Sequence, residues 1–196
     1  MDAAVQVFAQ HGFFHARVTD IAREAGVADG TIYLYFKNKD DLLISLFEDR
    51  MEGIIAAFRA ELSRLEGAAE RLDKFVEMHL GMVEREPQLA EVLTVELRQS
   101  SKFMREYKAP RFQEYLDILA EIFELGRRTG EFRPDLEPRI LKRILFGALD
   151  EVSLVWSSTR RDKYALADAA REIRNLCVRG LMASATHETA QQGDRP

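Results

Sequence analysis

Apolar residues recur along most of the chain at intervals of three and four, the spacing that places side chains on one face of an α-helix. No segment shows the strict apolar–polar alternation, followed by a hairpin turn, that indicates β-strands. The pattern predicts helices over residues 2–10, 18–25, 40–65, 68–85, 89–99, 110–126, 139–158 and 163–185, with one short helix ending near residue 36. The predicted fold class is therefore all-α, with about nine helices.

The turn that follows the second predicted helix gives the clearest local signal. Gly26 suits the left-handed backbone that commonly ends a helix, and we expect Val27 after it to pack inward. In the next helix Ile32 and Phe36 are four apart and should face the core, which turns their neighbours outward. A helix, a glycine turn and a short aromatic helix form a helix-turn-helix, whose second helix enters the major groove of DNA. The sequence therefore predicts a three-helix DNA-binding domain over residues 1–45.

The outward residues of this domain have side chains suited to DNA. Tyrosine hydroxyls can donate to phosphates, a leucine can contact a thymine methyl group, and a glycine allows close approach of the backbone. We expect Asn38 to cap the next helix, so that Lys39 lies in its first turn, where the helix dipole and the ammonium attract an anion. The candidate DNA-contacting residues are Thr19, Asp29, Gly30, Thr31, Tyr33, Leu34, Tyr35 and Lys39. Spacing alone leaves open a second interpretation, in which the aromatic residues only form the core of a small bundle.

The remainder of the chain is predicted to form a helical body. Its first helix, over residues 40–65, begins at the DNA-binding segment and ends inside the body, as a lever between the two would. We assign residues 46–186 to an effector-binding and dimerisation domain. The polar residues 187–196 are predicted to form a flexible tail.

The last two predicted helices combine small residues with large aliphatic ones. The small residues are Gly147, Ala148, Ser153, Ala167, Ala170, Gly180 and Ala183. Such residues let helices approach closely, so one face of this pair can meet a symmetry mate as a four-helix bundle. A hairpin buried wholly within one subunit is the alternative. We expect a homodimer through these two helices, because a helix-turn-helix gains specificity from two half-sites roughly 34–36 Å apart.

Residues 96–112 place several lysines and arginines among large apolar side chains, in a chain that is acidic overall. Cations beside an apolar lining suit a ligand with an anionic head and an apolar tail, and a guanidinium binds two phosphate oxygens at once. The alternative is a solvated basic face over an ordinary core. The residues alone leave both interpretations open.

Composition limits the class of protein. The 196 residues include 28 Lys and Arg against 33 Asp and Glu, a net charge of −5, which argues against indiscriminate nucleic-acid binding but permits a local DNA-binding surface. No apolar run approaches the roughly 18 residues of a membrane helix, no signal peptide opens the sequence, and the single Cys177 fits a reducing compartment. We expect a cytoplasmic protein that does not enter a membrane.

The sequence lacks the usual catalytic and metal-binding arrangements. His11 and His15 are four apart, but Gly12 between them interrupts the helix that would align them. A glycine-rich phosphate loop, a Gly-x-Ser-x-Gly motif and a Cys/His cluster are all missing. We expect no enzymatic activity, no bound metal and no cofactor.

The run from residue 19 to residue 43, TDIAREAGVADGTIYLYFKNKDDLL, resembles the DNA-binding domain of the TetR family. The resemblance extends over residues 3–47 and implies that Tyr33, Tyr35 and Lys39 contact phosphates. The residues that it places nearest the bases are Asp29, Gly30, Thr31 and Leu34.

Two features depart from the family pattern. Many members have Ser or Thr at the helix N-caps where this chain has Arg17 and Ala28. Many members also carry a basic arm before the first helix, whereas acidic residues outnumber basic ones in the first helices of this chain. We therefore expect modest non-specific affinity for DNA, or further residues upstream of Met1.

Three further stretches, residues 37–47, 95–100 and 144–151 with its continuation to Trp156, resemble the acyl-CoA-responsive branch of the TetR family, whose members repress fatty-acid degradation. The resemblance implies a long-chain acyl-CoA effector, with its tail in a tunnel through the body and its phosphates on basic residues near the mouth. By side-chain chemistry, the phosphate candidates are Arg98, Lys102, Arg105 and Arg111. The tunnel candidates are Phe58, Leu62, Met82, Leu93, Leu97, Phe103, Tyr107, Phe112, Leu149 and Trp156.

The combined prediction is a ligand-responsive repressor that binds a palindromic operator as a homodimer and is released by a long-chain acyl-CoA. Two alternatives remain at this point. The effector of such a repressor could be another hydrophobic molecule, such as a drug or a signal, or the chain could be a helical lipid carrier with no role at DNA.

Overall fold

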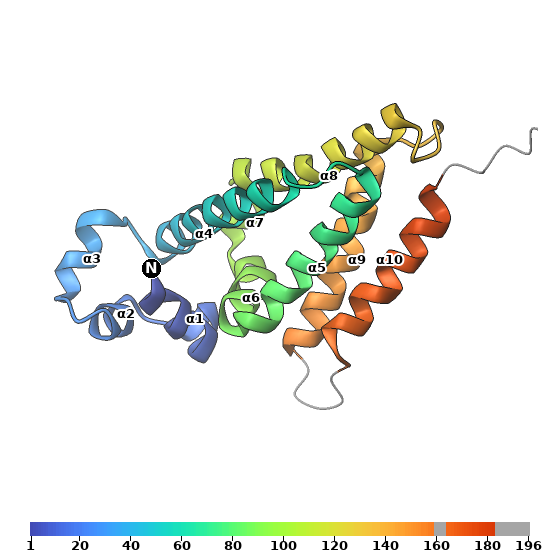
Figure 1. Cartoon of the computed structure of the whole chain (residues 1–196). Helices are drawn as coiled ribbons and strands as arrows, with labels where there is room; N and C mark the ends of the chain where they lie inside the picture. Colours follow the sequence, from blue (N-terminus) through green and yellow to red (C-terminus); the bar gives the residue numbers. More distant parts are fainter. Residues whose placement is uncertain (159–163, 183–196) are drawn as a thin grey trace, which may run out of the picture.

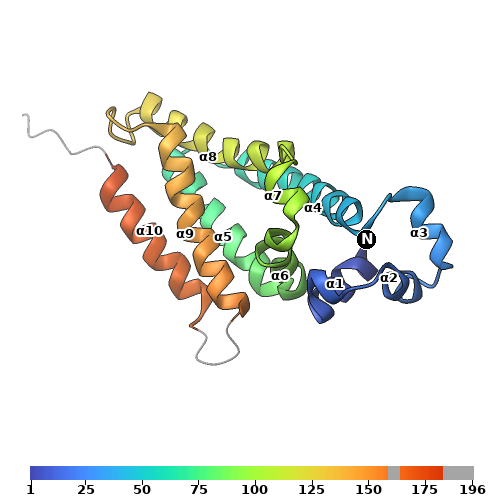
Figure 2. The same ribbon diagram turned by 180° about the vertical axis from the view of Figure 1, so that it is seen from behind.

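The computed structural model describes residues 1–158 and 164–182, and within them every regular element is a helix, which confirms the predicted fold class. In chain order the helices are α1 (Asp2–His15), α2 (Val18–Glu24), α3 (Asp29–Tyr35), α4 (Lys39–Leu62), α5 (Ala68–Arg85), α6 (Pro87–Thr94), the 3₁₀ helix η1 (Glu96–Gln99), α7 (Ser101–Arg105), α8 (Pro110–Thr129), α9 (Pro138–Ser158) and α10 (Leu166–Leu181). Helices α1–α3 gather at one end of an elongated molecule, and α4 leads from them into a body formed by the later helices (Figures 1 and 2).

Helix α1 has a kink at Gly12, where the backbone is left-handed with a φ of 70°. The sequence pattern predicts an end near residue 10, whereas helical turns resume after the kink. The kink folds Phe13 back onto Phe8, with ring centroids 5.9 Å apart and both side chains buried. A residue with a Cβ would be strained at this φ, so the glycine is what allows both rings to enter one core.

The turn between α2 and α3 has the hydrogen bonds of a Schellman motif. The Val27 N–H donates to the Ala22 carbonyl at 3.0 Å. The Gly26 N–H donates to the Arg23 carbonyl at 3.1 Å, and Gly26 has a φ of 67°. The predicted left-handed cap is therefore confirmed. The prediction that Val27 packs inward is wrong, because the turn projects into solvent and leaves 39% of this side chain exposed.

Helix α4 connects the two ends of the molecule. Its N-terminus is capped as predicted by Asn38, whose side chain accepts from the Asp41 N–H at 2.9 Å. Its buried residues form one stripe along the helix: Leu42, Leu43, Leu46, Phe47, Met51, Ile55, Phe58 and Leu62. Because this stripe is continuous, α4 shares its core with α1 at one end and with the body at the other.

Helices α4, α5, α8 and α9 surround an aromatic core in the body, with α10 packed against α5 on the outer side (Figure 2). The Phe58 ring lies 5.0 Å from that of Phe75 and 5.3 Å from that of Tyr115, measured between centroids. The Phe75 and Tyr115 rings are 5.2 Å apart. These distances are typical of edge-to-face aromatic packing, which gives the core a defined geometry.

The N-terminus of α5 is capped by a residue far along the chain. The backbone N–H groups of Ala68 and Ala69 each donate to a carboxylate oxygen of Glu131 at 3.0 Å. These bonds satisfy two of the donors that a helix leaves free at its N-terminus. The same two bonds lower the pKa of Glu131, since they favour the charged carboxylate.

The main departure from the predicted helices follows α6. One helix over residues 89–99 is predicted, but the chain instead forms α6, η1 and the separate α7. Ser100 stands at the break, where its Oγ accepts from the Phe103 N–H at 3.1 Å and caps α7. A serine that caps a new helix competes with continuation of the old one, which is the local reason for the break.

The last two predicted helices are present as α9 and α10, which lie side by side and antiparallel at the outer face of the body (Figure 1). Residues 159–163 between them lie outside the described residues, as do residues 183–196, which include the end of the last predicted helix with Ala183 and the predicted tail, 187–196. No helix among the residues that the structure describes is long and apolar enough to cross a membrane.

The packing of Gly126 in α8 leads to a stability prediction. A methyl group at this position would overlap the buried ring of Phe132, so we expect Gly126→Ala to lower the free energy of unfolding by about 1–3 kcal/mol. Gly53 also lies inside a helix but has open space around it, and Gly53→Ala should raise the free energy of unfolding by about 1 kcal/mol. Urea unfolding measures both variants, and equal effects would contradict this packing.

Candidate functional site

Helix α3 lies at the tip of the molecule (Figure 1). None of its residues is buried, and Tyr33, Leu34 and Tyr35 are 56%, 81% and 75% exposed. Ile32 and Phe36 are half-buried and pack against the core, as their spacing predicts. The outward tyrosines are therefore not the core of a small bundle, and exposed aromatic and apolar side chains grouped in this way indicate a binding surface.

The other candidates on this face differ in exposure. Thr19, Asp29 and Gly30 are exposed, whereas Thr31 is half-buried. Neither Arg17 before α2 nor Ala28 before α3 makes a side-chain cap, so the backbone donors at these helix starts lack the usual serine or threonine partner.

Lys39 is the exception among the candidates, because its ammonium turns toward the protein. Nζ donates to the carbonyl oxygens of Phe13 at 2.5 Å, Phe14 at 3.0 Å and Ala16 at 3.1 Å. It also lies 4.7 Å from the centre of the Phe13 ring. An ammonium has three donors. In this conformation Lys39 fastens the end of α1 to the start of α4 and keeps no free donor for a phosphate.

An apolar cavity of about 70 Å³ lies inside the body, between α4, α5, α6, α8 and α9, and we call it the interior cavity. Its lining residues are Phe47, Met51, Ile54, His79, Met82, Val83, Ala90, Leu93, Thr94, Phe112, Tyr115, Phe146 and Asp150. Ligand sites usually have volumes of about 300–1,000 Å³. The interior cavity is therefore nearly closed in this conformation and has to widen before a ligand of that size enters.

The predicted tunnel residues are distributed unevenly around this cavity. Met82, Leu93 and Phe112 line it. Phe58, Leu97 and Leu149 are buried in the surrounding core. Leu62, near the far end of α4, lines a separate surface depression.

Phe103 and Tyr107 reach the interior cavity only through its wall residue Phe47. Their ring centroids lie 5.2 Å and 6.3 Å from that of Phe47. Trp156 lies farther along α9, where its Nε1 donates to the backbone oxygen of Tyr164 at 3.2 Å. The break that separates α7 from α6 sets the positions of Phe103 and Tyr107, whereas Trp156 lies beyond the cavity because it is near the C-terminal end of α9.

The wall also contains residues that the sequence reasoning missed, and His79 is the most informative of them. Its Nδ1 lies 2.7 Å from Tyr115 Oη and its Nε2 lies 3.3 Å from Ser153 Oγ. Ser153 Oγ donates in turn to the Leu149 carbonyl at 2.7 Å. The helical spacing of apolar residues on α5 is the signal that could have placed His79 inside, since it falls on the buried stripe.

These buried polar groups are uncharged at neutral pH. Burial lowers the pKa of His79 to about 4 and raises the pKa of Tyr115 well above its ordinary value. Both residues belong to one hydrogen-bonded chain, which satisfies polar groups that would otherwise be costly in an apolar core. The wall of the cavity is therefore neutral where these rings meet it, which suits an uncharged ligand segment.

The predicted phosphate candidates differ in how firmly they are held. Arg98 Nη2 donates to both carboxylate oxygens of Asp150, at 2.8 Å and 2.6 Å, and Asp150 lines the interior cavity. Lys102 is half-buried and Arg105 is exposed, and both belong to α7.

Arg111 is surrounded by acidic groups. Its guanidinium nitrogens lie 3.0 Å from Glu114, 3.3 Å from Glu52 and 4.0 Å from Glu48. Burial is the main reason that the pKa of Glu48 is raised, an effect that Arg111 partly offsets. A phosphate would have to compete with these carboxylates for Arg111.

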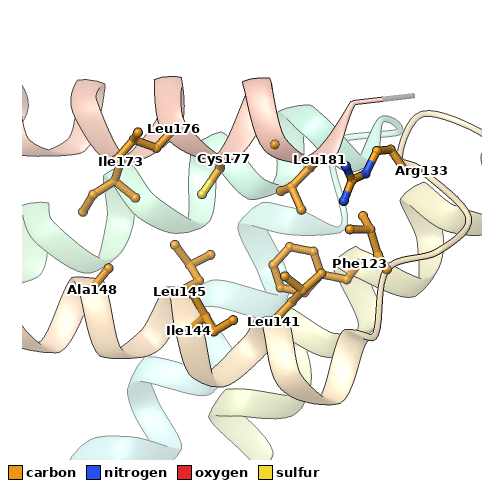
Figure 3. Close-up of a pocket in the computed structure, with 12 residues that line it drawn as sticks. Phe123, Arg133, Leu141, Ile144, Leu145, Ala148, Ile173, Leu176, Cys177 and Leu181 are labelled. Carbon is orange, nitrogen blue, oxygen red and sulfur yellow. The ribbon is translucent and has the colours of Figure 1, made fainter. Parts of the chain in front are cut away.

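An apolar groove of about 330 Å³ lies between α9 and α10, and we call it the outer groove (Figure 3). Leu145 of α9 faces Cys177 and Leu181 of α10 across it (Figure 3). Ile144 and Leu176 at its edge are 62% and 75% exposed. An apolar surface of this kind marks an interaction site.

Two family descriptions match the chain. Residues 1–46 match the bacterial regulatory proteins of the tetR family, and residues 47–180 match the C-terminal region of YsiA-like proteins. The chain belongs to the TetR family. Because TetR-family proteins are transcription regulators, the chain is a regulator and not an enzyme.

This TetR-family chain is similar to named regulators over most of its length. The fatty acid metabolism regulator protein of Bacillus subtilis (strain 168) is 37% identical over 181 residues, which cover 92% of this chain and 93% of that protein. The crystal structure of FadR from Bacillus subtilis in complex with stearoyl-CoA has a TM-score of 0.85 at 37% identity, covering 91% of this chain and 96% of that chain. The fatty acid degradation regulator FadR from Bacillus halodurans has a TM-score of 0.82 at 38% identity, with coverage of 92% and 96%.

The buried His79 predicts how the stability of this TetR-family protein depends on pH. Its pKa is about 4 in the folded chain and returns to about 6.5 on unfolding, so its neutral ring stabilises the fold fully above pH 6.5. This contribution, roughly 3 kcal/mol in total, is lost as the pH falls from 6.5 to 4. Urea unfolding should show a smaller acid loss for His79→Gln, whose amide does not titrate, than for the wild type. Identical pH dependence in the two proteins would show that the ring is not buried as a neutral group.

Proposed function

We propose that this protein is a homodimeric repressor of fatty-acid degradation genes, which binds a palindromic operator in the cytoplasm and is released from it by a long-chain acyl-CoA. The observation that carries the proposal is the 37% identity over 92% of the chain with a fatty acid metabolism regulator, together with the TM-score of 0.85 to FadR bound to stearoyl-CoA. The interior cavity and the basic side chains at its edge offer the two kinds of contact that an acyl-CoA needs.

The DNA-binding domain is proposed to be residues 1–45, with α3 in the major groove. The exposure of Tyr33 and Tyr35 supports phosphate contacts, and that of Leu34 supports a contact with the bases. The other proposed contacts around them are Thr19, Asp29, Gly30 and Thr31. Since acidic residues outnumber basic ones here, two copies of the domain are needed for tight and specific binding.

For Lys39 the geometry supports an indirect role in DNA binding. Its bonds to the carbonyls of Phe13, Phe14 and Ala16 set the position of α4 against α1. We propose that Lys39 fixes the position of the DNA-binding domain relative to α4, which we call the lever helix. Its ammonium can reach a phosphate only after it breaks one of these hydrogen bonds to a carbonyl.

The effector-binding and dimerisation domain is proposed to be residues 46–186, with the outer groove covered by a second copy of the chain. Two half-sites of a palindrome lie about one helical turn of DNA apart, so two copies must be held at a fixed separation. Antiparallel α9 and α10 present the apolar surface that a four-helix interface needs. Burial raises the pKa of the Cys177 thiol in this groove, which supports a packing role for it.

The acyl tail is proposed to occupy the interior cavity after the cavity widens, and the phosphates to bind basic residues of η1, α7 and α8. Arg98 is the best placed of these, because its partner Asp150 stands on the cavity wall. Lys102 and Arg105 on the neighbouring α7 can add charge to the same site. Arg111 is the weakest candidate, since three carboxylates already surround it.

Fluorescence anisotropy with a labelled DNA fragment from upstream of the protein's own gene tests this function. Lauroyl-CoA should raise the dissociation constant for the fragment tenfold or more, which corresponds to about 1.4 kcal/mol and lies within the usual range of allosteric coupling. Laurate and free CoA, added separately at the same concentrations, should not. Binding without any release would favour another hydrophobic effector, and failure to bind the fragment at low salt would favour a lipid carrier.

Two exposed leucines test the proposed dimer. Leu176, at the outer groove, and Leu34, on α3, are 75% and 81% exposed in the single chain, so replacing either by glutamate should leave the fold intact. Leu176→Glu should sediment as a monomer of 22.5 kDa, because a charge would be buried in the interface. Leu34→Glu should sediment as a dimer and lose operator affinity. A dimeric Leu176→Glu would place the interface elsewhere.

A further inference from the structure

Residues 96–100, which we call the strap, make contacts with three different parts of the molecule. The strap comprises η1 and the serine that follows it, between the end of α6 and the start of α7. One of its side chains contacts α1, one contacts the first turn of α4 and one contacts a wall residue of the interior cavity. It therefore connects the proposed effector site directly with the DNA-binding end.

The contact with α1 is made by Glu96. Its side chain is only 5% exposed, and its carboxylate accepts from the Phe13 N–H and from Gln99 Nε2, the latter at 3.0 Å. Gly12, whose left-handed backbone makes the kink in α1, lies directly beside this carboxylate. A buried carboxylate that loses such a donor leaves a costly unpaired charge, so α1 is firmly tied to the strap.

The contact with α4 is made by Ser100, which is fully buried. Its hydroxyl donates to Asp40 Oδ1 at 2.5 Å while its oxygen caps α7. Asp40 follows Lys39 directly in the chain, and Lys39 holds the end of α1. The strap is thus bonded to both partners of the joint between α1 and α4.

The third contact faces the interior cavity. Arg98 Nη2 lies 2.8 Å and 2.6 Å from the two oxygens of Asp150, and Asp150 belongs to the cavity wall on α9. Because the cavity of about 70 Å³ must widen to admit a ligand, its walls must move apart. Movement of α9 changes the distance between Asp150 and Arg98, and so acts on the strap.

We propose that the strap is a latch that couples the interior cavity to the DNA-binding domain. In the closed arrangement described above, the Arg98–Asp150 pair keeps Glu96 on α1 and Ser100 on α4, and the domain is held in its operator-binding position. An effector that enters the cavity separates this pair, its anionic head replaces Asp150 beside Arg98, and the strap releases α1 and α4. This inference rests on the proposed function, because it describes how that same site is regulated.

The latch has a thermodynamic signature that ordinary damage to the fold does not produce. The operator binds the closed state of the latch and the effector binds the open state. The two ligands therefore shift the equilibrium between these states in opposite directions. A variant that weakens the latch should therefore bind the operator less tightly and the effector more tightly. General destabilisation or a damaged cavity would instead weaken both.

Two substitutions in the full-length dimer test the latch. Asp150→Asn removes the charge that holds Arg98, and Glu96→Gln weakens the bond to α1 from outside the cavity, where no direct contact with the ligand is involved. The control is Glu121→Gln, which removes an exposed ion pair with Arg59 on another face of the body. The dissociation constant for operator DNA is measured without effector, and that for lauroyl-CoA is measured by calorimetry without DNA.

Both latch variants should lose operator affinity by about fivefold or more and gain a similar factor in affinity for lauroyl-CoA, whereas the control should match the wild type in both. Operator affinity equal to the wild type, or weaker binding of both ligands, would overturn the latch. If either variant fails to fold, Ser100→Ala takes its place with the same expectations. If the wild type does not bind lauroyl-CoA, the acyl-CoA assignment fails, and the operator affinities of the variants still decide whether the strap holds the DNA-binding domain.

Discussion

The polar backbone at the end of α1 has to be satisfied by charged side chains from distant parts of the chain, and the arrangement of the whole molecule depends on this. The Phe13 N–H is bonded to Glu96 of the strap, and its carbonyl is bonded to Lys39 at the start of α4. A helix end that loses such partners exposes donors and acceptors at a cost of about 1–3 kcal/mol each. The position of the DNA-binding domain is therefore fixed jointly by the lever helix and by the strap, and neither can shift without disturbing the same turn.

The body is built around a neutral interior that is almost full of its own side chains. His79 and Tyr115 are bonded to each other rather than to ions, and Phe146 and Phe112 pack edge to face beside them at 4.9 Å. A core of this kind is stable without ligand, because few voids are left to fill. An effector must therefore separate side chains that already pack together. Part of the free energy of binding its tail is then used to move the helices that carry those side chains.

The sequence was sufficient where structure depends on neighbours in the chain. The left-handed Gly26 and the cap at Asn38 follow from local chemistry, and both are found in place. The fold class and the family could be predicted for the same reason, since helical spacing and the α2–α3 segment are short-range patterns.

Long-range partners were not predictable in this way. The break at Ser100 is held by Asp40, sixty residues away. The residue types of Arg98 and Lys39 do not reveal that their partners in this structure are Asp150 and the backbone carbonyls at the end of α1. Only Met82, Leu93 and Phe112 among the tunnel candidates line the interior cavity, because the face of a helix that meets a cavity is decided by packing and not by residue type.

The cap on α5 has a consequence for synthesis of the chain. Glu131, which bonds to the first turn of α5, follows Ala68 by 63 residues. At about 5–20 residues per second, the ribosome makes it roughly 3–13 s after Ala68. During that interval the first turn of α5 lacks its native acceptor, and α10, one of the helices that pack against α5, is made later still. Helices α1–α3 are contiguous in the chain, but the Phe13 N–H at the end of α1 waits longer still, because its acceptor Glu96 follows it by 83 residues. The DNA-binding end and the first turn of α5 therefore both complete their native hydrogen bonds only after later parts of the chain have been made.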